Sequence, residues 1–74
     1  MNTNATDTLL NLLASRRKGS SIAAQARELR LSQPYWSMVA NGKRNLGKRA
    51  LNRIRVTYAD LAPLAIAALL DGGN

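Results

Sequence analysis

Apolar residues recur three and four positions apart along this chain, in short segments bounded by glycines or polar capping residues. This spacing places apolar side chains on one face of an α-helix. The chain has 74 residues and no cysteine, so one small core must hold it together without disulfides. We therefore expect a single all-α domain over residues 1–74, a compact bundle of about five short helices.

The first helix is expected to be capped by Thr6 or Asp7 and to end at Gly19, after the basic run Arg16–Lys18. Its inward-facing residues are expected to be Leu9, Leu12 and Leu13.

Two short helices follow, separated by a tight turn. Ser20 or Ser21 is expected to cap the first of them, which ends around Arg30; Ser32 caps the second, which ends at Asn41-Gly42. Pro34 falls in a first turn, where a missing N–H costs little. The inward-facing residues are expected to be Ile22, Ala26 and Leu29, then Trp36, Val39 and Ala40.

The remaining chain predicts two more helices. One runs from about Gly47 to Arg55, and its β-branched continuation, Val56–Tyr58, is either extended or helical. Asp60 is expected to cap the last helix, and residues 71–74 to end it. The apolar run Leu61–Leu70 is too short to span a membrane.

The charge is large and unevenly placed. The net charge is +7, six of the eleven basic residues lie between Lys43 and Arg55, and none follows Arg55. A basic stripe beside a neutral tail is typical of a protein that binds a polyanion. The alternative is a solvated surface that only maintains solubility.

The composition argues against catalysis. The chain has no histidine and no cysteine, and its four acidic residues are scattered. Most zinc sites and most nucleophile–base systems are thereby excluded, so we expect no enzyme activity, cofactor or metal. Because Met1–Asp7 lacks the apolar core of a signal peptide, we expect a cytoplasmic protein.

The third helix has an unusual outer face. A helix exposed to bulk water normally carries charges outside, but this face is uncharged, which suits entry into the major groove of DNA. The expected base-reading residues are Gln33, Pro34, Tyr35, Ser37 and Met38. The expected phosphate-binding residues are Ser21, Asn41, Lys43, Arg44, Lys48 and Arg49. The alternative is an ordinary polar surface.

Residues 26–44 resemble the helix-turn-helix of the lambda repressor/Cro-type family, with the motif covering about residues 21–42. The residues that carry the resemblance are Ala26, Leu31, Ser32-Gln33, Trp36, Val39 and Asn41-Gly42-Lys43-Arg44. The family usually has glycine where this chain has Arg30, glutamine where it has Ile22, and an apolar residue where it has Gln25. Because a left-handed Arg30 costs roughly 1 kcal/mol, we expect a differently shaped turn.

The apolar last helix, about residues 60–70, predicts a homodimer with two-fold symmetry, which spaces two recognition helices by roughly 34 Å on a palindromic operator. The expected interface residues are Leu61, Leu64, Ile66, Leu69 and Leu70. The alternative is that this helix only closes the core of a monomer.

Together, the residues and the resemblance imply a sequence-specific transcriptional regulator that binds double-stranded DNA, most simply a Cro-like repressor without a small-molecule ligand. The resemblance also implies that the protein is associated with the nucleoid of a bacterial or phage-infected cell. Two alternatives stay open: a helix-turn-helix antitoxin that binds a toxin and represses its own operon, and a non-specific nucleic-acid-binding protein.

Overall fold

The computed structural model describes residues 5–70. The predicted end of the last helix at residues 71–74 lies outside them. Within this range the chain is all-α, as predicted, with five α-helices and one short 3-10 helix. The elements are α1 (Ala5–Arg16), α2 (Ile22–Leu29), α3 (Gln33–Ala40), α4 (Lys48–Thr57), η1 (Ala59–Leu61) and α5 (Ala62–Leu70).

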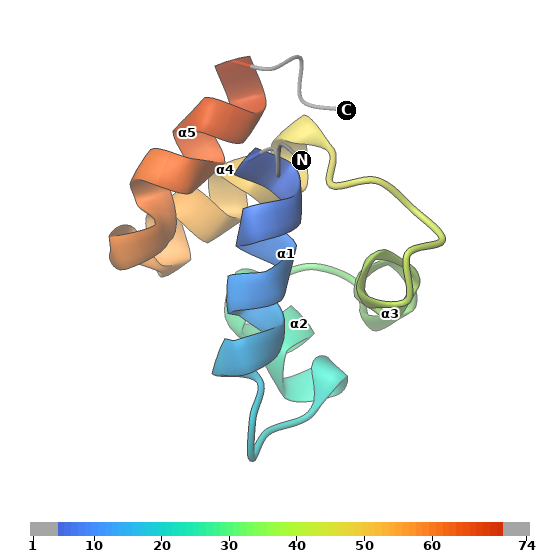
Figure 1. Cartoon of the computed structure of the whole chain (residues 1–74). Coiled ribbons are helices and arrows are strands. Elements are labelled where there is room, and N and C mark those ends of the chain that lie inside the picture. The colour runs from blue at the N-terminus through green and yellow to red at the C-terminus, as the bar shows by residue number, and fades with distance from the viewer. Residues whose placement is uncertain (1–4, 71–74) are drawn as a thin grey trace.

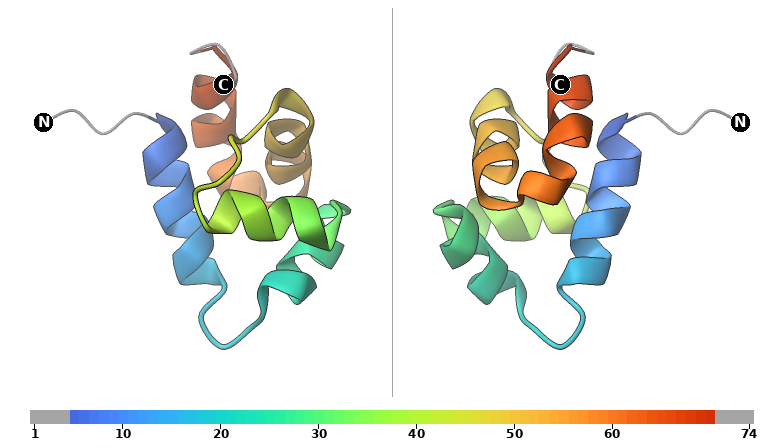
Figure 2. Two further views of the ribbon diagram at one scale, coloured as in Figure 1. Left: turned by 90° about the vertical axis from the view of Figure 1, so that its right-hand side faces the viewer. Right: turned by 90° about the vertical axis from the view of Figure 1, so that its left-hand side faces the viewer.

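The helices form a bundle in which α3 is the most peripheral element (Figure 1). Helix α5 packs against both α1 and α4, and α2 packs against both α3 and α4. Helix α3 packs chiefly against α2, and it lies on the side of the molecule away from α5 (Figure 2). The outer face of α3 is therefore left uncovered by the other described helices.

The core draws on every helix. Trp36 is 1% exposed, which confirms that this tryptophan is a core residue. The other buried apolar residues are Leu9, Leu13, Ala26, Leu29, Val39, Leu46, Ala50, Leu51, Ile54, Tyr58, Leu61, Ala65 and Ala68.

Helix α1 differs from its prediction at both the start and the buried face. Thr6 and Asp7 lie inside the helix rather than at its cap. Leu9 and Leu13 are fully buried, whereas Leu12 is 40% exposed. Residues four apart are neighbours on one helix face, and the stripe that α1 buries is centred between Leu9 and Leu13, so Leu12 falls at its edge.

The serine caps of the next two helices are confirmed. The Ser21 hydroxyl accepts a hydrogen bond from the Ala24 N–H at 3.0 Å. The Ser32 hydroxyl accepts one from the Tyr35 N–H at 3.3 Å. Each bond satisfies one of the N–H groups that have no partner in the first turn of a helix.

The turn between α2 and α3 keeps the left-handed conformation that the sequence argued against. Arg30 has φ 57° and ψ 40°, so the expectation of a differently shaped turn was wrong. The Arg30 N–H donates to the Arg27 carbonyl at 3.1 Å, and the Leu31 N–H donates to the Ala26 carbonyl at 2.9 Å. These are the two bonds of a Schellman motif, and Leu31 also packs against the core. They offset the strain at Arg30.

The C-terminal part of the structure resolves the conformation of Val56–Tyr58 and shows that Asp60 does not cap the last helix. Val56 and Thr57 are the last residues of α4 and are helical, whereas Tyr58 is its C-cap and leaves the helix with φ −115° and ψ 84°. Asp60 lies inside η1 and pairs with Arg16 of α1 instead of capping α5. The tertiary fold brings Arg16 close to this carboxylate, and their attraction determines its role.

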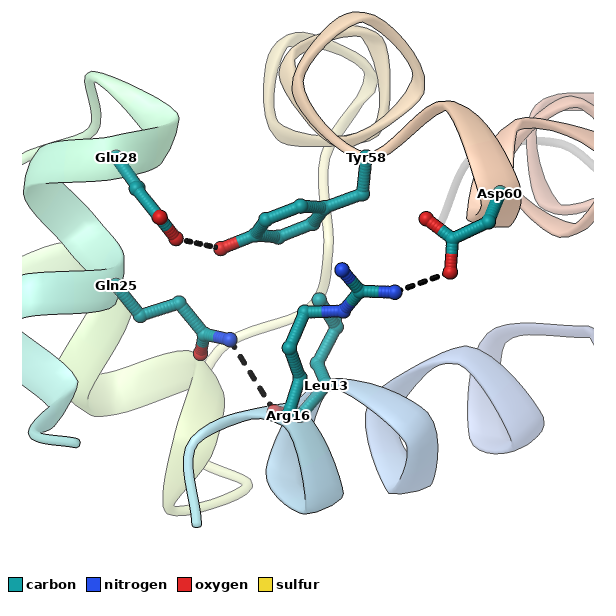
Figure 3. Close-up of polar contacts among 6 residues, drawn as sticks. All are labelled: Leu13, Arg16, Gln25, Glu28, Tyr58 and Asp60. Carbon is teal, nitrogen blue, oxygen red and sulfur yellow. Dashed lines mark hydrogen bonds and ion pairs between the residues drawn. The ribbon is translucent and has the colours of Figure 1, made fainter. Parts of the chain in front are cut away.

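A polar cluster joins α1, α2 and η1 around Tyr58 (Figure 3). The Tyr58 hydroxyl donates to the Glu28 carboxylate, and the guanidinium carbon of Arg16 lies 4.5 Å from the centroid of the Tyr58 ring. Burial, followed by the hydrogen bond to Glu28, raises the pKa of Tyr58 from 10.0 to about 12.

Replacing Arg30 by glycine is expected to stabilise the fold. Relief of about 1–2 kcal/mol of left-handed strain is partly offset by about 0.5–1 kcal/mol of glycine backbone entropy. We expect a net gain of roughly 0.5–1 kcal/mol in the free energy of unfolding, measured by urea denaturation. Arg30→Ala is the matched control, because it removes the same charge but keeps the Cβ atom. An equal gain in both variants would assign the effect to charge instead of backbone strain.

The raised pKa of Tyr58 predicts a pH dependence at alkaline pH. The folded protein holds this proton more tightly than the unfolded chain, so the stabilisation is complete below pH 10.0 and is lost as the pH rises towards about 12. Urea denaturation across this range should show a steeper loss of stability in the wild type than in Tyr58→Phe, in which all the lysines still titrate. Parallel curves for the two proteins would contradict the prediction.

Candidate nucleic-acid interface

The outer face of α3 is exposed and uncharged. Only Trp36 and Val39 of this helix are buried, and Met38 is 45% exposed. The other predicted base-reading residues divide into exposed and half-buried ones. Gln33 and Pro34 are exposed, and Ser37 and Tyr35 are half-buried. Figure 2 shows α3 lying across the front of the molecule, where this face meets solvent.

A buried amide fixes α3 to the rest of the bundle. Gln25 of α2 is only 4% exposed, and its side-chain oxygen accepts the indole N–H of Trp36 at 2.9 Å. The same oxygen accepts a hydrogen bond from Arg17 at 3.0 Å. The amide nitrogen donates to the Leu13 carbonyl at 3.2 Å, as Figure 3 shows. One side chain therefore ties α3 to the end of α1.

From the sequence, Gln25 stands out only as a departure from the family pattern. Its position carried a further signal, because it lies three residues after Ile22 and four before Leu29, on the face that α2 buries. A buried amide needs hydrogen-bond partners, and the single indole N–H of the chain was one available donor.

Tyr35 holds the basic loop that follows α3. Its hydroxyl donates to the Asn45 carbonyl at 3.0 Å and accepts the Gly47 N–H at 3.2 Å. Gly47 is the N-cap of α4. The tyrosine predicted to read bases thus uses its polar atom to order the loop and the start of the next helix.

Four predicted phosphate-binding cations are exposed beside α3: Lys43, Arg44, Lys48 and Arg49. Lys43 and Arg44 belong to the loop, and the Arg44 guanidinium carbon lies 5.7 Å from the centroid of the Tyr35 ring. Lys48 and Arg49 begin α4, whose first turn has neither an acidic residue nor a side-chain cap. Because cations are unfavourable at the positive end of a helix dipole, this turn carries positive charge that no group within α4 neutralises.

The other two residues of the predicted phosphate-binding set lie at helix ends. Asn41 is the exposed C-cap of α3. Ser21 is exposed, and its hydroxyl serves as the N-cap acceptor of α2.

A groove separates the α2–α3 turn from the start of α4. Its volume is about 410 Å³. Its walls are formed by Leu31, Ser32, Tyr35, Gly47, Lys48, Arg49 and Ala50. The two cations of α4 therefore lie along the edge of a depression, next to the helix with the uncharged face.

Other cations serve the fold instead. Arg16 pairs with Asp60, and Arg17 is bound to Gln25. The Arg53 Nε–H donates to the Leu29 carbonyl at 3.0 Å, where a cation suits the end of α2. The basic residues thus divide into cations bound to other groups of the fold and exposed cations near α3.

The predicted dimer residues, Leu61 at the end of η1 and four residues of α5, also divide. Leu61 is 6% exposed and belongs to the core, whereas Ile66 is 45% and Leu70 is 82% exposed. Leu64 and Leu69 are partly buried against the core. The exposed apolar surface of α5 is therefore centred on Ile66 and Leu70.

Residues 5–70 were expected to hold neither a metal site nor a membrane-spanning helix. No three side chains of the metal-binding types come together in this range. None of its helices combines the length and the apolar character needed to cross a membrane.

Comparison with protein-family models, with curated proteins and with solved structures gave no match.

Removing the Tyr35 hydroxyl is expected to loosen the basic loop. Tyr35→Phe loses two hydrogen bonds, each worth roughly 0.5–1.5 kcal/mol, while keeping the ring in place. Hydrogen exchange at the Gly47 amide should become faster. Ser37→Ala on the same helix is the control and should leave that amide unchanged. Unaltered exchange in Tyr35→Phe would show that the loop is ordered by other contacts.

Proposed function

We propose that this protein is a sequence-specific regulator that binds double-stranded DNA through α3, in the manner of a helix-turn-helix repressor. The observation that carries the proposal is the exposed, uncharged face of α3 beside exposed cations. Gln33, Pro34 and Met38 present no charge to solvent, and Lys43 and Arg44 follow directly after the helix.

This arrangement suits two kinds of contact with DNA, one to the bases and one to the phosphates. Base edges in the major groove are read by polar and apolar side chains, such as glutamine on adenine or methionine against a thymine methyl group. Phosphates are held by cations, which position the protein without reading sequence. The cations of the loop and of α4 lie where they can straddle a groove occupied by α3.

The mechanism that follows is control by occupancy. A bound protein of this kind blocks access to a promoter, and its own concentration sets how often the site is filled. The net charge of +7 supplies a salt-dependent attraction to any DNA, and the α3 face adds the preference for one sequence.

The first experiment is selection of bound duplexes from a random DNA library at about 0.15 M salt, near physiological ionic strength. A recurring sequence supports the proposal. Binding without a preferred sequence, which vanishes as salt rises, would identify a non-specific nucleic-acid binder and reject the regulator.

Substitutions then separate the two kinds of contact. Gln33→Ala should cost about 1–3 kcal/mol on the selected site and relax the preference at one base position. Lys43→Gln should weaken binding to all duplexes alike and reduce the slope of the salt dependence by about 1. Arg55→Gln is the control, because Arg55 is exposed on α4, away from its first turn. Uniform weakening by Gln33→Ala would remove this residue from base reading.

We also propose that the regulator is a homodimer joined through α5. Ile66 and Leu70 of α5 expose apolar surface, and α5 lies on the side of the bundle away from α3 (Figure 2), so a contact through α5 leaves both α3 helices free. Two-fold symmetry predicts an inverted repeat with half-sites about one helical turn apart.

Charged substitutions at Ile66 and Leu70 test the dimer. Ile66→Asp with Leu70→Asp should convert a dimer to a monomer in analytical ultracentrifugation. Val56→Asp is the control, because Val56 is also exposed, at 61%, but lies on α4. A wild-type chain that sediments as a monomer at high micromolar concentration would contradict the dimer. Capture of a different protein by the α5 surface would favour an antitoxin.

A further inference from the structure

The packing of α3 against the bundle centres on two buried side chains. The helix packs chiefly against α2, and Trp36 and Val39 are its only buried residues. Val39 offers apolar contact alone, which permits a helix to rotate or slide slightly. The indole N–H of Trp36 instead forms a directional hydrogen bond of 2.9 Å with Gln25, which fixes both rotation and register.

The same amide oxygen is shared with a cation of the α1–α2 loop. Arg17 donates to it through one guanidinium nitrogen at 3.0 Å. A guanidinium carries five N–H donors, so Arg17 keeps others that can bind an anion. Its neighbour Lys18 is exposed, carries the same charge and has no bond to Gln25, which makes it a natural control.

We propose that Gln25 is a positioning residue for DNA recognition, which couples the binding of a phosphate by Arg17 to the orientation of α3 through Trp36. The inference rests on the proposed function and deepens it. Arg17, Gln25 and Trp36 form one chain of hydrogen bonds from the α1–α2 loop to the helix that faces the bases. A phosphate bound by Arg17 holds its guanidinium in place. The guanidinium then holds the Gln25 amide, and the amide holds the Trp36 indole.

Coupling of this kind has a distinct consequence for affinity. A cation that acts only through its charge attracts all duplexes equally, so its loss leaves the ratio of specific to non-specific affinity unchanged. A residue that orients α3 affects the selected site alone, because only base contacts need that orientation. The affinity ratio therefore distinguishes positioning from plain electrostatics and from a merely structural role.

The test measures affinity for the selected site and for a scrambled duplex at one salt concentration. Gln25→Leu, which removes the acceptor shared by Trp36 and Arg17, should lower the ratio at least roughly tenfold, the size expected for the loss of one buried hydrogen bond. Gln25→Glu keeps the acceptor but loses the donor to the Leu13 carbonyl, and it should retain most of the ratio. Both variants lose the bond to Leu13, so their difference isolates the two bonds that the side-chain oxygen accepts, from Trp36 and from Arg17.

Two further comparisons keep the test independent of folding defects. Trp36→Phe removes the same bond from the other side, and its combination with Gln25→Leu should lower the ratio no further than either change alone. Arg17→Met should lower the ratio, whereas Lys18→Met should weaken both duplexes alike. Circular dichroism confirms that each variant is folded, and the fluorescence of Trp36, the only tryptophan, reports the indole environment.

The outcomes separate the two proposals. A wild type without sequence preference overturns the proposed function and the inference with it. A wild type with a preferred site, together with an unchanged ratio in folded Gln25→Leu or equal behaviour of Arg17→Met and Lys18→Met, overturns the inference alone. A lower ratio in Gln25→Leu, its retention in Gln25→Glu and the contrast between the two cation variants support it.

Discussion

The buried amide of Gln25 is the interaction on which the arrangement of α1, α2 and α3 depends. Its oxygen accepts two hydrogen bonds and its nitrogen donates one, so the group is well satisfied inside the protein. A buried polar group without partners costs about 1–3 kcal/mol, which penalises any packing of α3 that would separate the indole from the amide. An apolar residue at this position would fill the space but would not select one orientation of α3.

The basic residues fall into two groups, those bound to neighbouring elements and those exposed near α3. Arg16, Arg17 and Arg53 are bound to groups of neighbouring elements, and they help to define how the helices meet. Lys43, Arg44, Lys48 and Arg49 are exposed near α3. Lys48 and Arg49 lie in the first turn of α4, where the helix dipole disfavours cations. Departures from local preference of this kind are expected at functional sites, and this one lies beside the uncharged face of α3.

Specific contacts also hold the two ends of α3. Before the helix, Arg30 adopts a left-handed conformation that its hydrogen bonds and the packing of Leu31 maintain. After the helix, Tyr35 holds the loop at Asn45 and Gly47. Both ends of α3 are thus restrained by specific contacts, while its outer face stays uncommitted. A helix that is held at both ends and exposes one face presents the side chains of that face in a fixed arrangement.

The sequence by itself determined the helices, their serine caps and the uncharged face of α3, because these depend on residues within one or two turns of each other. It could not determine that Leu12 is exposed, that Asp60 pairs with Arg16, or which cations are free. These features depend on contacts between residues far apart in the chain, such as Arg16 and Asp60, which are separated by 44 positions. The role of Gln25 was likewise decided only by the tertiary structure, because a buried amide is defined by the partners that folding brings to it.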